Sequence, residues 1–476
     1  MGSPDSEPHL HVANVDERAP YVTLSHCWGN SQPLTTTRET LQDRQQEIAL
    51  STFPKTYKDA VLITRGLGVK YLWIDSLCIV QDDKLDWIEQ AQQMSDIYLN
   101  AEMLIAAADA ADSSEGCLLP RQLPWKLKYM PRRLFEFSHS DQQSLLVYPY
   151  PSFFNAIRNN RLNKRAWCLQ ELALSPRTLY CTKSQLYWQC GEIGFTECGI
   201  KPSQTRGRWT FGSDAVFNLP FHDQRDWTFS WWAVSMNFST RQLTFPKDKL
   251  MAMAGITNFF AQKLDDKPMF GLWQKDLHFG LLWRCGPEEM RRCTEPEGIP
   301  SWSWMALDGP FKLSHHGLTR IKYTKLADIT LQGGMDESRL VIKGRLLEGK
   351  SLGTMETRII DVKGIAVRYG VIFSLCNSIE KDKSPREQAI GWHLFDLLPE
   401  ETHCTMYCLE ISTTRWGEHW HGIEGMTEHR PLRTHNVLLL EKVVEKSGVY
   451  RRIGVGFIDH SLGVFEKVEA VTLTLV

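Results

Sequence analysis

The first 190 residues alternate short apolar runs with stretches of helical spacing, and this alternation most restricts the fold. Apolar runs predict five strands, at Tyr21–Ser25, Val69–Ile74, Met103–Ala108, Thr178–Cys181 and Leu186–Cys190. Between them, Thr56–Leu67 and Asp86–Leu99 carry apolar side chains at helical intervals. Strands that alternate with helices are typical of an α/β fold with a parallel sheet and crossover helices. Runs without polar alternation fit strands that are buried on both faces.

Polar residues follow the first two predicted strands. Ser25, His26, Trp28 and Gly29 stand at the end of the first strand, and Asp75 stands at the end of the second. Because ligands bind beyond the carboxyl ends of strands in such sheets, we expect these residues around one cleft. Four of them also have an ordinary structural interpretation: Ser25 could cap a turn, Asp75 could cap the following segment, His26 could be a satisfied structural histidine, and Trp28 could serve packing.

A third helix is predicted at Arg165–Ser175, where Pro176 ends it because the residue before a proline avoids the helical region. Trp167 and Glu171 lie four residues apart and therefore on the same face of this helix. A carboxylate against an indole is partly desolvated and can be tuned for chemistry. The alternative is an ordinary amphipathic helix whose glutamate faces water and whose tryptophan serves packing.

Three segments in this order resemble the fungal heterokaryon incompatibility (HET) domain. They are Tyr21–Gly29 (YVTLSHCWG), Tyr71–Ile79 (YLWIDSLCI) and Arg165–Leu172 (RAWCLQEL). The resemblance covers about residues 20–190, so we predict a HET domain at 15–200 with an insertion near 109–164. It implies a role in non-self recognition and programmed cell death, with a possible protein partner as the trigger.

The order of strands and helices also resembles, more distantly, the Toll/interleukin-1 receptor (TIR) domain, whose sheet is flavodoxin-like. Trp167–Leu172 is similar to the plant TIR segment whose glutamate is catalytic in NAD cleavage. The resemblance implies that Glu171 is catalytic and that NAD is a substrate, with no separate cofactor. It also implies a substrate-binding set of Ser25, His26, Trp28, Gly29, Asp75 and Trp167. The chain departs from TIR domains in lacking a basic residue after the first strand and in the length of 109–164.

The chemistry that this resemblance implies starts from a cationic leaving group on a ribose. Loss of nicotinamide creates an oxocarbenium-like centre, which a nearby carboxylate such as Glu171 can stabilise. Trp28 or Trp167 could stack on a ring of the nucleotide. The competing interpretation is a non-enzymatic, TIR-like module that signals by self-association, in which the glutamate is structural.

The remaining chain contains two segments that differ in composition and in hydrophobic pattern. Residues 205–310 are rich in tryptophan and predict helices at Trp227–Phe238, Lys249–Phe260 and Leu272–Trp283. Residues 311–476 contain short alternating runs with glycines, such as Leu340–Gly344 and Tyr450–Ile458, and predict a β-rich domain.

Composition restricts the partners and the compartment. The net charge of −2 gives no basic field for nucleic acid, and no apolar run approaches the roughly 20 residues that span a bilayer. Twelve scattered cysteines favour reduced thiols and a cytoplasmic location. We predict no metal site, because the spacing of one loose cluster does not fit zinc fingers; its members are His403, Cys404, Cys408, His419 and His421.

Overall fold

The computed structural model of the chain describes most of the sequence. The described residues are 6–14, 16–29, 34–120, 135–138, 144–147, 157, 159–190, 194–197, 224–285, 291–292, 298–313, 322–332, 339–361, 364–375, 391–395, 405–415, 433–443 and 446–476. The chain divides into two compact units, Met1–Phe260 and Ala261–Val476.

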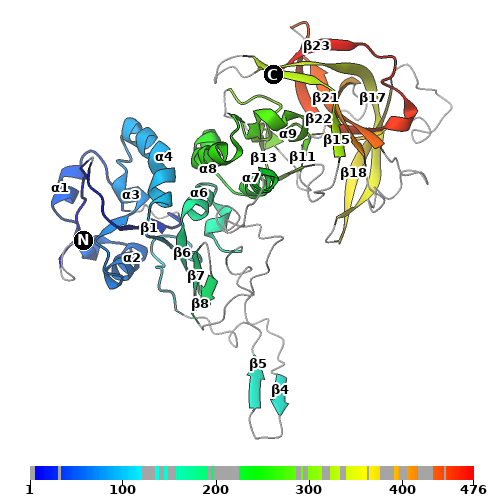
Figure 1. Ribbon diagram of the computed structural model, residues 1–476. Coiled ribbons are helices and arrows are strands. Elements are labelled where there is room, and N and C mark those ends of the chain that lie inside the picture. Colours follow the sequence, from blue (N-terminus) through cyan, green and yellow to red (C-terminus); the bar gives the residue numbers. More distant parts are fainter. Residues whose placement is uncertain are drawn as a thin grey trace. The chain divides into compact units, whose positions relative to one another are not determined.

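The first unit is built on a mixed sheet, of which Figure 1 labels β1, β6, β7 and β8. Its described strands have the order β2-β1-β3-β6-β7-β8. The strands are β1 (Tyr21–Ser25), β2 (Tyr71–Trp73), β3 (Met103–Ala106), β6 (Arg177–Cys181), β7 (Leu186–Cys190) and β8 (Gly194–Thr196). The first four are parallel to one another, with Val22 opposite both Leu72 and Met103. The prediction of an α/β fold with parallel strands is therefore confirmed.

The last two strands of this sheet correct the expectation of a parallel sheet throughout. Strands β7 and β8 are antiparallel to their neighbours. Only four residues, 182–185, join β6 to β7, and so short a connection closes a hairpin, whereas a parallel pair needs a long crossover. The Thr182 hydroxyl closes this turn by donating to Gln185 O at 2.7 Å.

Helices connect the parallel strands. They are α1 (Leu41–Gln46), α2 (Lys55–Gly66), α3 (Asp75–Cys78), α4 (Lys84–Leu99) and α6 (Trp167–Leu174), with the 3-10 turns η1 (Leu50–Thr52) and η3 (Leu162–Lys164). Helix α2 buries Tyr57, Ala60 and Val61 against Val22 and Leu24 of β1, which forms the core of this unit. Successive residues of a strand face opposite sides, so Ser25 points to the other face of the sheet. Helix α6 packs on β1, β3 and α4.

Two longer helices come next in the described chain: α7 (Gln224–Ser239) precedes the turn η5 (Pro246–Asp248), and α8 (Lys249–Leu264) follows it. They correspond to two of the three helices predicted for the tryptophan-rich segment. The rings of Trp227 and Trp231 pack edge-on against Phe260, with ring centroids 6.0 and 5.5 Å apart. Within the predicted insertion, the described residues include a hairpin of β4 (Phe135–Ser138) and β5 (Ser144–Val147).

The third predicted helix of that segment, Leu272–Trp283, is wrong. The chain there forms β10 (Leu272–Trp273), the turn η6 (Gln274–Asp276), the one-turn helix α9 (Leu277–Gly280) and β11 (Trp283–Cys285). Strand β10 pairs with β9 (Pro268–Met269) across Phe270 and Gly271, which both have positive φ. The Asp266 carboxylate then accepts from Lys275 N at 3.1 Å, so side-chain and hairpin contacts override the helical spacing.

The second unit is rich in β-structure, as predicted. Its described strands form a nine-stranded sheet of β15 (Lys322–Lys325), β16 (Asp328–Gln332), β17 (Arg339–Asp361), β18 (Gly364–Leu375), β19 (Gly391–Phe395), β20 (Thr405–Arg415), β21 (Arg433–Lys442), β22 (Val449–Asp459) and β23 (Ala470–Leu475). The pairs are antiparallel except β22 with β23. Smaller elements precede this sheet: β12 (Arg291–Arg292), η7 (Trp304–Ala306), β13 (Leu307–Asp308) and β14 (Phe311–Leu313), and η9 (His460–Leu462) follows β22.

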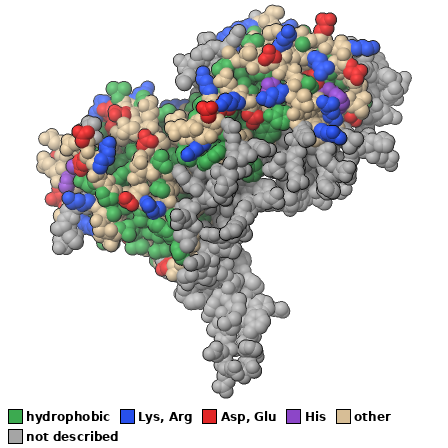
Figure 2. All heavy atoms as spheres, viewed as in Figure 1, with side chains coloured by type: hydrophobic (Ala, Val, Ile, Leu, Met, Phe, Trp, Pro, Cys, Tyr) green, Lys and Arg blue, Asp and Glu red, His purple; other side chains and the backbone are tan. Residues whose placement is uncertain are grey.

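The surface of the described residues carries charges of both signs. Figure 2 shows acidic and basic side chains interspersed on the face in view of both units. Among the helices that the structure describes, none combines the length and apolarity that a membrane crossing requires.

Candidate functional site

The carboxyl ends of β1 and β2 bring most of the predicted residues together. Ser25 ends β1 and His26 follows it, while Asp75 begins α3 within two residues of the end of β2. The chain leaves β1 toward β2 on one side and returns to β3 on the other, so the order of the sheet reverses at β1. Such a switch point is where open α/β sheets bind ligands. Glu171 reaches the same place from helix α6, which packs on β1 and β3.

Glu171 is a buried acid at the centre of this group. Its residue surface is 5 % exposed. Burial, together with the charge of Asp75, raises the pKa of the Glu171 carboxyl to about 7, although Ser25, Arg165 and Cys168 act to lower it. At neutral pH the side chain is therefore divided between its protonated and ionised forms. Tyr98 of α4 lies against it, and burial together with the Glu171 charge raises the pKa of this tyrosine.

Asp75 is held in a fixed orientation at the edge of the site. Its Oδ2 accepts from the indole N–H of Trp28 at 3.0 Å, and its Oδ1 accepts from Ser76 N at 2.7 Å. The side chain stays 22 % exposed. A carboxylate with one solvent-facing side and two internal donors is suited to holding ribose hydroxyls, because hydroxyl groups donate to it.

His26 is locked by a chain of hydroxyl groups. The Ser76 hydroxyl donates its proton to Leu34 O at 3.1 Å. The Tyr57 hydroxyl lies 2.7 Å from Ser76 Oγ and is therefore the donor in the bond between these two hydroxyl groups. His26 Nε2, 3.1 Å from the Tyr57 oxygen, is then the donor in its own contact. Burial lowers the pKa of His26 to about 4, so the ring is neutral at pH 7 and its Nδ1 is a bare acceptor.

Two buried polar atoms of this site have no hydrogen-bond partner among the described residues. They are His26 Nδ1, which is 3.9 Å from Asp75 Oδ1, and the hydroxyl of Ser25, which is close enough to Glu171 to lower its pKa. The two residues are 3 % and 1 % exposed. Unsatisfied buried groups are uncommon in folded proteins and mark places where a ligand or water completes the bonding.

The last two predicted residues lie at the margin of the site. Gly29 has φ +71°, and a Cβ atom there would lie 2.2 Å from the Cβ of Asp112, so the loop after β1 requires glycine. Trp167 packs its ring edge-on against Trp87 of α4, with centroids 6.1 Å apart, and also interacts with the Asp248 carboxyl. These contacts place Trp167 in the packing between helices.

Sequence reasoning missed the residues that set the electrostatics. Arg165 lies directly before α6 and donates through Nη1 to His26 O. Tyr98 contacts Glu171, and Cys168 adds a buried thiol whose pKa is raised by burial and by the Glu171 charge. The sequence did contain a signal for Arg165, because this residue belongs to the same motif, Arg165–Leu172, as Glu171. Tyr98 gave none, because only the packing of α4 on α6 brings it there.

The described residues contain no group of three histidine, cysteine or carboxylate side chains arranged for a metal ion. Of the loose cluster noted in the sequence, Cys408 is buried in β20. The other four members, His403, Cys404, His419 and His421, lie outside the described residues.

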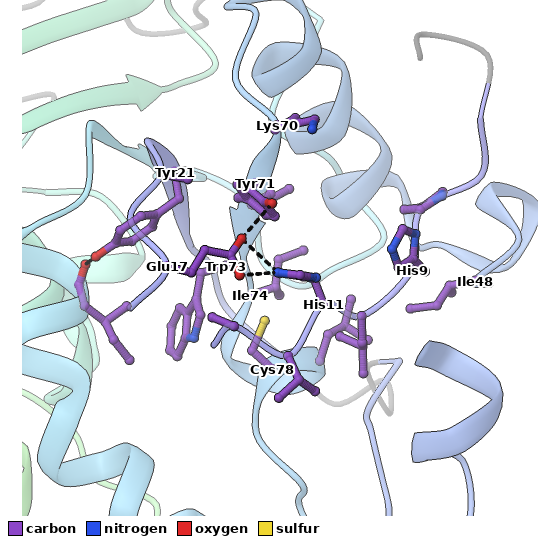
Figure 3. Close-up of a pocket in the computed structure, with 18 of the residues that line it drawn as sticks. His9, His11, Glu17, Tyr21, Ile48, Lys70, Tyr71, Trp73, Ile74 and Cys78 are labelled. Atoms are coloured by element: carbon purple, nitrogen blue, oxygen red, sulfur yellow. Dashed lines mark hydrogen bonds and ion pairs between the residues drawn. The ribbon is translucent and has the colours of Figure 1, made fainter. Parts of the chain in front are cut away.

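A separate hollow of about 1270 Å³ lies beside edge strand β2 (Figure 3). It is lined by Tyr71, Trp73 and the segment that precedes β1, and by none of the predicted site residues. In Figure 3, Glu17 stands between His11 and Tyr71, which bind its carboxylate at 2.8 and 3.0 Å. Because Glu17 is already engaged by the protein, this hollow offers a ligand less chemistry than the site at Glu171.

Comparison with known proteins agrees with the placement of these segments. Residues 21–171 match the model of the heterokaryon incompatibility protein (HET) family. No curated protein and no solved structure matches the chain. The matched region begins with β1 and ends at Glu171, so it spans the strand ends and the carboxylates described above. The chain therefore contains a HET domain in residues 21–171, which links it to heterokaryon incompatibility.

Proposed function

We propose that the HET domain cleaves NAD at the bond between nicotinamide and ribose, with Glu171 as the catalytic carboxylate. The observation that carries the proposal is the burial of Glu171 beside Asp75 at the carboxyl ends of β1 and β2, with a pKa of about 7. The resemblance of Trp167–Leu172 to the catalytic segment of TIR domains supports it and suggests a TIR-like fold for this part of the chain.

The proposed reaction needs a negative charge where a positive one develops. Nicotinamide leaves as a neutral base with the electrons of the bond, and the ribose carbon becomes oxocarbenium-like. An ionised Glu171 in a poorly solvated site stabilises that centre more strongly than a carboxylate in water would. Water then adds to the carbon and releases a proton, which yields ADP-ribose; attack by the substrate's own adenine would give a cyclic product.

The pH dependence of turnover follows from the same carboxylate. If the ionised form acts, the rate is expected to rise about tenfold per pH unit well below pH 7 and to level off above it. Below the pKa the folded protein holds the proton on Glu171, and raising the pH through about 7 releases it.

The test is nicotinamide release by the purified full chain at high protein concentration, measured by chromatography for wild type and Glu171→Gln. Glu102→Gln is a matched control, because Glu102 is an exposed glutamate in the same unit, paired with Arg177 at 3.5 Å. The proposal expects turnover in wild type and Glu102→Gln and none in Glu171→Gln. Turnover that survives in Glu171→Gln would exclude this carboxylate as the catalyst.

One observation favours the alternative, a self-associating module without catalysis. Glu171, Ser25 and His26 are all at most 5 % exposed, which also suits a polar core that orders the domain. Under this hypothesis Glu171→Gln leaves self-association unchanged, and light scattering gives the same mass for wild type and variant. Loss of nicotinamide release in a variant that still associates would favour the enzyme.

A further inference from the structure

We infer that Arg165 binds the diphosphate of a dinucleotide at this site, near the carboxylates of Asp75 and Glu171. The inference deepens the proposed function, since it names the part of the substrate that the site recognises. It rests on that proposal for the identity of the reaction, and on the contacts of Arg165 for the binding of the anion.

The backbone of Arg165 is fixed from both sides. Its N–H donates to Leu162 O at 3.0 Å, and its carbonyl accepts from Nη1 of Arg241 at 3.1 Å. A parallel bridge pairs it with Gln242, which precedes the turn η5. The side chain therefore leaves a rigid backbone just before helix α6, and a charge placed in this way loses little entropy when it binds a ligand.

The guanidinium of Arg165 ends at the turn that follows β1. Its Nη1 donates to His26 O, and its charge acts on Cys27, Asp75 and Glu171. Among the described residues, the Arg165 side chain hydrogen-bonds to His26 O and to the Cys27 thiol, and no carboxylate forms an ion pair with it. An arginine has five N–H donors, so several donors stay available beside the two unsatisfied atoms of the site.

Arg241 shows how a purely structural arginine of the same region differs. Its Nε and Nη2 donate to the side-chain oxygens of Asn237 and Asn163, each at 2.8 Å, and its Nη1 donates to the Arg165 carbonyl. Neutral acceptors thus surround its planar group, which is buried within the fold. Among the residues that the structure describes, Arg165 has no such set of acceptors, and its remaining donors point to a ligand.

A diphosphate matches what the site lacks. Asp75 and Glu171 both repel an anionic ligand, so a dinucleotide needs a cation to hold its phosphates at this strand end. The planar fork of arginine binds two phosphate oxygens at once, which a lysine does not.

The test is calorimetric binding of ADP-ribose and of adenosine to the full chain. ADP-ribose carries the diphosphate and lacks nicotinamide, so binding is measured without turnover. We expect Arg165→Gln to weaken ADP-ribose binding at least tenfold, Arg165→Lys to weaken it less, and neither to change adenosine binding. Arg177→Gln is the control, because it removes an exposed cation at the opposite end of the sheet, on β6.

Three outcomes would overturn the inference: no binding of ADP-ribose to wild type, equal binding to folded Arg165→Gln, or an equal loss of adenosine and ADP-ribose. If Arg165→Gln does not fold, Arg165→Lys decides, and unchanged affinity in that variant counts against the diphosphate contact. Binding of ADP-ribose that depends on Arg165 without any NAD cleavage would refute the proposed reaction alone. Cleavage with an unchanged KM in Arg165→Gln would refute this inference alone.

Discussion

A buried carboxyl whose pKa is about 7 makes the stability of the fold depend on pH. The pKa of Glu171 is raised in the folded state from an ordinary value of 4.5, so the folded state holds the proton more tightly. The associated stability is fully present below about pH 4.5 and is lost as the pH rises through 7. Glu171→Gln carries no titrating proton, so its stability relative to wild type should improve by about 2–3 kcal/mol between pH 5 and pH 8.

Urea unfolding of both proteins at pH 5 and pH 8 measures this difference. The exposed pair Glu102 and Arg177 supplies the control, since Glu102→Gln should shift stability equally at the two pH values. Parallel pH profiles for wild type and Glu171→Gln would show that the carboxyl titrates normally and would remove the pH argument for its catalytic role.

Gly29 tests whether the turn after β1 is as tightly built as its geometry indicates. A Cβ atom at Gly29 would lie 2.2 Å from Asp112 Cβ, while at Gly68, with φ +72°, nothing lies within 4 Å. Gly68→Ala should cost about 1 kcal/mol through its backbone alone, and Gly29→Ala about 2–3 kcal/mol because the Asp112 contact adds to it. Equal losses in thermal unfolding would mean that the turn adjusts around the new methyl group.

At the scale of elements, the sequence predicts those features that depend on neighbouring residues alone, such as the residue at which a helix ends. Helix α2 ends at Gly66 and is followed by Gly68 with positive φ, and helix α6 ends just before Pro176, as their sequences indicate. The antiparallel β7 could not be read from apolar runs, because strand direction depends on the connection and the partner. The segment 272–283 has helical spacing, but contacts with Asp266 and a hairpin determine its structure.

In the candidate site, too, some features follow from the local sequence, and others depend on how the elements pack together. Ser25, His26 and Asp75 could be placed at strand ends, because a strand ends where its apolar run ends. The buried state of Glu171, the neutral His26 and the open donors of Arg165 could not be predicted. They depend on α4, α6 and the turn after β1 packing together, which no local pattern encodes.

Helix α4 offers a prediction at this scale. The Asp83 carboxylate caps it by accepting from Leu85 N at 3.0 Å and Asp86 N at 3.4 Å, and it also pairs with the exposed Arg38 at 2.9 Å. Asp83→Ala should lower stability, because Leu85 N and Asp86 N lose their acceptor, while Asp83→Asn retains most of the cap. Arg38→Ala isolates the ion pair and should change little. Denaturation curves in which Asp83→Asn falls as far as Asp83→Ala would assign the effect to the charge instead.

At the scale of the whole molecule, each unit has a core of its own. The first contains β1, β2, β3 and α2 around Val22 and Tyr57. The second contains inward residues of β20, β21 and β22 such as Met406, Leu439 and Ile458. Because cooperative unfolding follows a shared core, we expect the two units to lose protection against hydrogen exchange independently.

Arg452 provides the change that tests this independence. It is 1 % exposed, donates to Leu281 O at 3.2 Å and to Trp283 O at 2.6 Å, and lies 3.5 Å from the centroid of the Trp283 ring. Arg452→Leu leaves both carbonyls without these donors and removes the cation–π contact, so it should destabilise the second unit by about 3 kcal/mol.

Hydrogen exchange followed by mass spectrometry locates the effect of Arg452→Leu. Faster exchange in β21 and β22, with unchanged exchange in β1 and β3, is the expected result, because the lost contacts all belong to the second unit. Nicotinamide release and ADP-ribose binding should then persist, since Glu171 and Arg165 belong to the first unit. Faster exchange throughout the chain would instead show that the two cores unfold as one, and the HET domain would depend on the β-rich unit for its stability.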